Sequence, residues 1–162
     1  IVLPSIFLAW SYAGLVSALH ARSGERTRHW TQLALTFATI YAGLNTIVYP
    51  VQLAVIVPQA LSGGEGLASP FAMTAGQPLT AVNAAAYALL SLSCFLLSFA
   101  YAGQAGGKLA RGALIAHGAL APIILAILYI PAILPVGGLW IVTFPLAMVG
   151  VLRFEMSRTS TV

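Results

Sequence analysis

The stretch AVNAAAYALLSLSCFLLSFAYA, residues 81–102, carries no charged residue and is apolar over most of its length. An α-helix rises about 1.5 Å per residue, so about 20 residues cross a hydrocarbon core of about 30 Å. Length and composition therefore predict a membrane-spanning helix here. Four further apolar runs surround this stretch, and we expect them to span the membrane as well; they cover residues 2–19, 31–57, 113–134 and 139–154.

The overall composition is typical of a chain that faces lipid over most of its surface. Of the 162 residues, 60% are hydrophobic and only 6% are charged, whereas a soluble globular domain has roughly 25% charged residues. So little charge cannot cover a surface that is exposed to water. We therefore predict an all-α, polytopic membrane helical bundle of five transmembrane helices, which forms a single domain over residues 1–162.

The basic residues predict the orientation of this bundle. If the five runs are spans, all seven Lys and Arg residues fall on one side of the membrane. Positive charge accumulates on the cytoplasmic side, so we expect the N-terminus outside, the C-terminus in the cytoplasm and a location in the bacterial inner membrane. The same charges attract anionic headgroups, and no basic segment has the interleaved aromatic residues of a nucleic-acid site. These residues are Arg22, Arg26, Arg28, Lys108, Arg111, Arg153 and Arg158.

A polar stripe follows the helix expected at residues 81–102. Its members are three or four positions apart and fall within an arc of roughly 80°, because each residue turns the helix by about 100°. Lipid offers no hydrogen-bond partner, so the stripe must face protein, water or a ligand. Among the polar residues of this span only Ser93 lies off the stripe, which consists of Asn83, Tyr87, Ser91, Cys94, Ser98 and Tyr101.

A second polar stripe, Tyr41, Asn45, Tyr49 and Gln52, follows the helix expected at residues 31–57. The two stripes would meet in the outer half of the membrane beneath the loop at residues 59–80, where amides and phenols suit a carbonyl, a hydroxyl or a quinone-like headgroup. Interhelical hydrogen bonding without any ligand is the simpler explanation of such stripes. Trp10, near mid-membrane, needs a partner for its N–H or a ligand to stack on. The candidate ligand-binding residues are therefore Asn45, Tyr49, Gln52, Asn83, Tyr87 and Trp10.

The sequence gives little indication of a metal site or a catalytic site. His20, His29 and His117 are expected near the cytoplasmic face and would bind a metal or a haem iron only if their helix ends were adjacent. No Asp or Cys stands near them to complete a set of ligands, so no metal site is predicted. The only acids are three Glu residues outside the expected spans, and no ionisable group is expected deep in the membrane, where coupled transporters keep one. No catalytic motif is present.

Two segments carry a resemblance. Tyr49-Pro50-Val51-Gln52-Leu53 and Gly138-Leu139-Trp140-Ile141-Val142-Thr143-Phe144-Pro145 resemble segments of uncharacterised bacterial six-helix integral membrane proteins. That resemblance implies one further helix upstream of Ile1 and assigns no activity.

Three functions fit these observations. The polar stripes and the absence of acid–base residues favour a small accessory subunit or a bundle that binds a lipophilic ligand such as a lipid, quinone or pigment. A small membrane enzyme or transporter for an apolar substrate, bound at the outer-half amides, is the alternative. A haem-binding electron carrier that uses His20 and His117 is the third.

Overall fold

The computed structural model describes residues 2–63 and 71–159. All regular structure in this part of the chain is helical. Five helical segments are long and apolar enough to cross a membrane, which confirms the predicted fold class at the level of length and composition. They are Leu3–Ala21, Glu25–Leu61, Pro78–Tyr101, Lys108–Ala126 and Pro131–Arg158.

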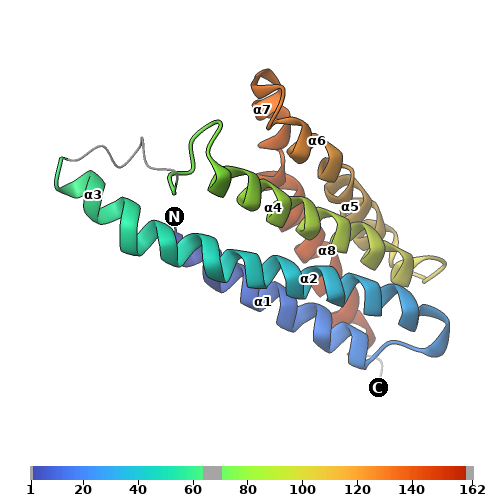
Figure 1. Ribbon diagram of the computed structural model, residues 1–162. Helices are drawn as coiled ribbons and strands as arrows, with labels where there is room; N and C mark the ends of the chain where they lie inside the picture. The colour runs from blue at the N-terminus through green and yellow to red at the C-terminus, as the bar shows by residue number, and fades with distance from the viewer. Residues whose placement is uncertain (1, 64–70, 160–162) are drawn as a thin grey trace.

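The bundle is built around α4 (Pro78–Leu97). On one side α4 packs against α2 (Glu25–Val51), which in turn packs against α1 (Val2–Ala21). On another side it packs against α5 (Lys108–Gly118) and α6 (Leu120–Ala126), and α5 packs against α8 (Trp140–Thr159). The rings of Tyr12 and Phe144, 5.6 Å apart, join α1 to α8. Figure 1 shows this arrangement.

The second span is longer than predicted at both ends. It begins at Glu25 and passes through Pro50, and the five residues after α2 form a π-helical segment, Gln52–Ile56, before α3 (Val57–Leu61). A proline lacks the N–H that continues the α-helical ladder, and π turns inside helices accompany such interruptions. The predicted span ended at residue 57, directly before Pro58, but Pro58 sits in the first turn of α3, where a missing N–H has little cost.

The fourth span was placed wrongly at residues 113–134. It begins at Lys108, changes from α5 to α6 at Ala119 and ends at Ala126. Ile130, with φ −129° and ψ 76°, lies outside the α-helical region, which is disfavoured for the residue before a proline. The reversal therefore lies at residues 127–130 rather than at 135–138, and two short helical segments, Pro131–Ile133 and α7 (Leu134–Gly137), lead into α8.

The fifth span also differs from the prediction, because α8 passes through Pro145 and continues to Thr159. Its last turn carries Arg158, which lies beyond the end predicted at residue 154. The part of the predicted loop at residues 64–70 lies outside the described residues.

Two glycines let helix backbones approach closely. A Cβ on Gly118 of α5 would lie 2.5 Å from the Cβ and 2.9 Å from the Cα of Phe95 on α4. A Cβ on Gly150 of α8 would lie 2.9 Å from the Cα of Ala110 on α5. Small residues at helix crossings permit this approach in membrane bundles, so these two positions set the spacing between α4, α5 and α8.

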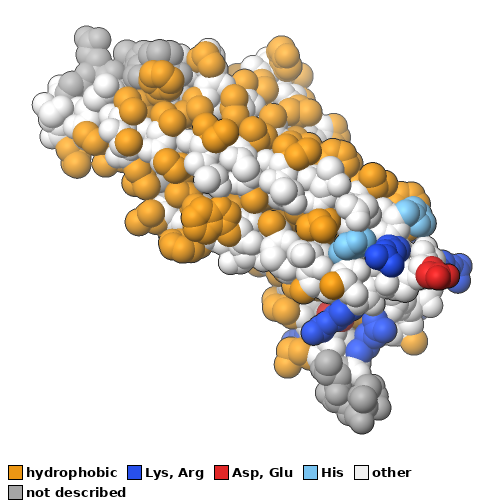
Figure 2. All heavy atoms as spheres, turned by 60° about the horizontal axis from the view of Figure 1, so that its bottom comes forward, with side chains coloured by type: hydrophobic (Ala, Val, Ile, Leu, Met, Phe, Trp, Pro, Cys, Tyr) orange, Lys and Arg blue, Asp and Glu red, His pale blue; other side chains and the backbone are white. Residues whose placement is uncertain are grey.

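The basic side chains gather at one end of the bundle. Figure 2 shows Lys and Arg there, whereas the remainder of that face is hydrophobic or uncharged. The cations come from the connection between α1 and α2, the first turn of α2, the start of α5 and the end of α8. The predicted grouping of the positive charges is thus present in the fold.

Candidate functional site: an apolar cleft with a polar edge

A cleft of about 350 Å³ opens at the end of the bundle opposite the basic side chains. We call it the apolar cleft. α6, the segment after it and the start of α8 form an apolar wall, and α1, α2 and α4 supply the hydroxyl and amide groups. It is lined by Ser5, Tyr49, Thr80, Asn83, Ala84, Tyr87, Ile124, Ile127, Leu128, Leu134, Gly137, Gly138 and Trp140.

Asn83 is the most informative residue of the apolar cleft. It lies in the second turn of α4, lines the cleft, and its Oδ1 is buried without a hydrogen-bond partner among the described residues. A buried amide oxygen that is left unpaired costs about 1–3 kcal/mol. Because the unpaired oxygen is an acceptor, a ligand that donates a hydrogen bond, such as one with a hydroxyl group, would remove this cost.

Two phenols form the polar edge beside Asn83. The hydroxyl oxygens of Tyr49 on α2 and Tyr87 on α4 are 2.8 Å apart and share a hydrogen bond. The ring of Tyr87 also contacts the rings of Tyr41 at 5.8 Å and Trp140 at 5.3 Å. Trp140 therefore connects the phenols to the apolar wall, and the cleft combines one aromatic face with one hydrogen-bonding edge.

Two of the predicted site residues are buried elsewhere. Asn45 donates from Nδ2 to the carbonyl oxygen of Tyr41 at 2.8 Å, and its Oδ1 has no partner within the described part of the chain. Gln52 donates from Nε2 to the carbonyl oxygen of Phe71 and so ties the second span to the connection before α4. Neither side chain lines the apolar cleft. The expectation that both amides would share a pocket with Asn83 was therefore wrong.

Trp10 does not belong to the cleft either. Half of its surface is exposed, its Nε1–H donates to Thr46 Oγ1 at 2.9 Å, and its ring meets Phe7 edge to face at 5.9 Å. The indole N–H that needed a partner finds one on α2. Trp10 thus joins α1 to α2 on a face that is turned outward, and no ligand is required to explain it.

The structure does not bring the three histidines together. His20 Nδ1 lies 2.9 Å from Thr31 Oγ1, and His29 packs its ring on Trp30 at 4.6 Å. His117 lies on α5 against Phe144, with 5.3 Å between the rings. Within residues 2–63 and 71–159 no three His, Cys, Asp or Glu side chains are grouped so that they could hold a metal ion.

His117 lies much deeper than the sequence suggested. It is fully buried, and because α5 begins at Lys108 it stands roughly 14 Å along the helix axis from that residue. The expectation that no ionisable side chain lies inside the bundle was wrong for this reason. The helix simply begins five residues earlier than its apolar run.

His117 is hydrogen bonded to α8 through Nδ1. Thr143 Oγ1 lies 2.9 Å from His117 Nδ1 and 3.1 Å from the carbonyl oxygen of Leu139, which also accepts from the backbone N–H of Thr143 at 2.9 Å. The Thr143 hydroxyl pairs with Nδ1 in either tautomer of the neutral imidazole, because a hydroxyl can donate or accept. Nε2 is buried with no partner from the residues that the structure describes.

The polar stripe of α4 faces the interior, as predicted, but the stripe missed the best-connected residue. Ser93 is fully buried; it donates to the carbonyl oxygen of Ala34 at 2.7 Å and shares a 2.9 Å hydrogen bond with the hydroxyl of Tyr12. That hydroxyl is also 3.2 Å from the thiol of Cys94. Ser93 therefore connects α4 to both α1 and α2, because α4 is covered by neighbours over more than one face.

Neither a protein family, nor a curated protein, nor a solved structure matches this chain. The resemblance to uncharacterised six-helix membrane proteins stays a prediction.

Proposed function

We propose that this chain is a small multi-pass protein of the bacterial inner membrane that holds a lipophilic molecule, such as a lipid, quinone or pigment, in the apolar cleft, on its own or as an accessory subunit. Its basic end faces the cytoplasm in this proposal, in accord with the positive-inside rule. The apolar cleft then opens in the outer half of the bilayer, where a lipophile enters from the membrane.

The observation that supports the proposal best is the unpaired Oδ1 of Asn83 in the lining of an otherwise apolar cleft. Ligand pockets are mostly apolar and contain a few placed polar groups, and their volumes begin at about 300 Å³. The apolar cleft, at about 350 Å³, accommodates a ring-sized headgroup with part of its chain. The Tyr49–Tyr87 pair supplies a second polar contact beside Asn83.

Native mass spectrometry of the gently solubilised protein, with an absorption spectrum of the same sample, tests this proposal. We expect a stoichiometric lipophile to be retained by the wild-type protein. Ala84→Phe should expel it, because Ala84 lines the cleft and a phenyl ring would fill the space. Ala81→Phe is the matched control, since Ala81 lies at the same end of α4 but is exposed and outside the cleft.

Two results would overturn the proposal. One is a wild-type protein that carries no lipophile even when it is extracted without delipidation. The other is equal retention by Ala84→Phe and the wild-type protein, which would place the bound molecule elsewhere on the bundle.

A further inference from the structure

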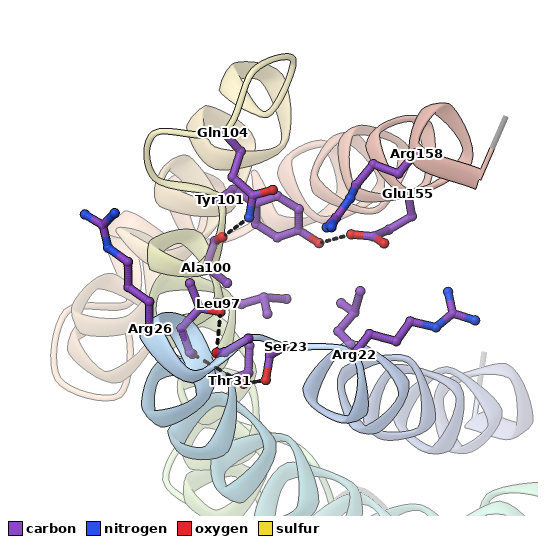
Figure 3. A pocket seen from close by; sticks show the side chains of 13 residues that line it. Arg22, Ser23, Arg26, Thr31, Leu97, Ala100, Tyr101, Gln104, Glu155 and Arg158 are labelled. Carbon is purple, nitrogen blue, oxygen red and sulfur yellow. Dashed lines mark hydrogen bonds between the residues drawn. The ribbon is translucent and has the colours of Figure 1, made fainter. Parts of the chain in front are cut away.

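A second cavity, of about 250 Å³, lies at the basic end of the bundle. We call it the basic cavity. The end of α1, the start of α2, the turn after α4 and the end of α8 surround it. Figure 3 shows Arg22 and Arg26 on opposite sides of the opening, with their guanidinium groups directed away from it, and Arg158 directed toward Tyr101 and Glu155.

Electric charge distinguishes the basic cavity. Its lining contains three arginines and one acid, Glu155, so the formal charge of the lining side chains is 3 − 1 = +2. The four other cations of the chain, Arg28, Lys108, Arg111 and Arg153, do not line it. The hydroxyl of Tyr101 donates a hydrogen bond to Glu155 Oε1 at 3.4 Å, so this oxygen of the acid already has a partner.

The walls of the basic cavity are held in place by hydrogen bonds. Thr31, almost fully buried, lies 3.0 Å from Ser23 Oγ and 2.9 Å from His20 Nδ1, and Ser23 donates to the carbonyl oxygen of His20 at 2.7 Å. This network fixes the turn that carries Arg22. The guanidinium of Arg158 lies 5.6 Å from the centre of the Phe154 ring, which limits its freedom in the same way.

The start of α2 borders the opening. Gly24, the N-cap residue, lines the cavity, and no side chain caps the helix there. The N-terminus of a helix favours an anion. Three long arginine side chains around the opening and a helix N-terminus together match a group with several anionic oxygens, toward which Arg22 and Arg26 would turn on binding, and phosphate offers more of these oxygens than a carboxylate.

We propose that the basic cavity binds a phosphate ester group. Its volume suits a headgroup rather than a whole lipid molecule. The ligand is either the headgroup of an anionic phospholipid or a soluble phosphate, since both present the same chemistry to the three arginines. This site is independent of the apolar cleft and does not rest on the function proposed for it.

Two binding experiments on the full chain distinguish these sources. In the first, the protein is embedded in nanodiscs of phosphatidylcholine with phosphatidylglycerol and is released from them in a mass spectrometer. The number of phosphatidylglycerol molecules that each protein retains is then counted. In the second, protein in nanodiscs of phosphatidylcholine alone is titrated with inorganic phosphate by calorimetry. Retained phosphatidylglycerol identifies a headgroup site, and saturable phosphate binding in the neutral nanodiscs identifies a soluble ligand.

The double variant Arg26→Gln/Arg158→Gln should weaken the observed binding about tenfold or more, because each lost charge-assisted hydrogen bond is worth about one decade. Arg28→Gln/Arg111→Gln removes the same charge from exposed positions outside the cavity and should change binding less than about threefold. If the first double variant does not fold, Gln104→Glu provides the second test, because it adds a carboxylate to the lining without removing a cation.

The proposal is overturned if neither experiment shows saturable binding to the wild-type protein. It is equally overturned if the two double variants weaken binding to the same extent, since the attraction would then come from net charge and not from the cavity.

Discussion

The two ends of this bundle hold spaces of similar size and opposite chemistry. The apolar cleft, about 350 Å³, has an apolar wall and one unpaired amide oxygen, whereas the basic cavity, about 250 Å³, has three arginines and a helix N-terminus. α4 borders both, with Asn83 in its second turn and Leu97 at its end. One helix therefore lines a space at each end of the bundle, and the two spaces differ in chemistry more than in volume.

The layer between the two ends is held together by packing and by hydrogen bonds. Gly118 brings α5 against α4, and Ser93 bonds α4 to α1 and α2. Two further hollows along the helices, about 420 Å³ between α4 and α6 and about 190 Å³ between α1 and α8, have almost entirely apolar linings. The close crossings of this middle layer hold the two ends in place, so the first prediction concerns one of these crossings.

The largest effect is expected from Gly118→Ala. The added Cβ would meet the Cα of Phe95 at 2.9 Å, so α5 must move away from α4, at a cost of about 2–3 kcal/mol in the free energy of unfolding. Thermal unfolding in detergent measures this loss. Gly43→Ala is the control, because nothing lies within 4 Å of its Cβ position; equal melting temperatures for the two variants would disprove the close crossing.

The next effect concerns the hydroxyl that pairs with His117. Thr143→Val removes the oxygen that is hydrogen bonded to Nδ1 and leaves a buried ring nitrogen unpaired, which costs about 2 kcal/mol. Thr36→Val serves as the comparison, since the Thr36 hydroxyl is exposed and bonds to Gln32 of its own helix at 3.1 Å. Unfolding measurements that rank Thr36→Val as the more harmful change would contradict the hydrogen bond between Thr143 and His117.

A crossed pair of variants tests whether the two ends act independently. Ala84→Phe should lower lipophile retention about tenfold, equivalent to about 1.4 kcal/mol, and leave phosphate binding unchanged. Arg26→Gln/Arg158→Gln should weaken phosphate binding about tenfold and leave lipophile retention unchanged. Native mass spectrometry reads lipophile retention in both variants, and the nanodisc experiments read phosphate binding. Loss of both ligands in either variant would show that the ends are coupled through α4.

The smallest effect should come from Asn83→Leu. Replacing a buried amide whose oxygen is unpaired with an apolar side chain should raise the free energy of unfolding of the empty protein by about 1 kcal/mol. The same change should weaken retention of a lipophile with a polar headgroup several-fold. A variant that loses stability without any change in retention would show that the amide has a structural role only.

The sequence predicted the number of spans and their approximate positions, because each apolar run is long enough to be read without tertiary information. It did not predict their ends. Lys108 and Arg111 looked like loop residues, yet they occupy the first turns of α5, where long basic side chains reach the headgroups. Pro58 looked like a terminator, yet it stands where the first turn of α3 tolerates it.

The candidate site was predicted in part. Helical spacing identified Tyr49, Asn83 and Tyr87, which all line the apolar cleft. A helical wheel gives the direction of a side chain but not whether the neighbouring helix covers it, so Asn45 and Gln52 were grouped with them although both are covered. The opposite wall, with Ile127 and Trp140, was missed because the reversal before α8 was placed several residues too late.

The π-helical segment Gln52–Ile56 has a consequence for changes in the length of the chain. A π turn holds one residue more than an α turn. Deleting one residue from 53–56 is therefore absorbed by a return to α geometry, and the residues before and after it keep their faces. The same deletion at Leu90 would rotate the rest of α4 by about 100° and turn its buried side chains toward lipid. Homologous chains that differ by one residue should thus have their gap in this segment.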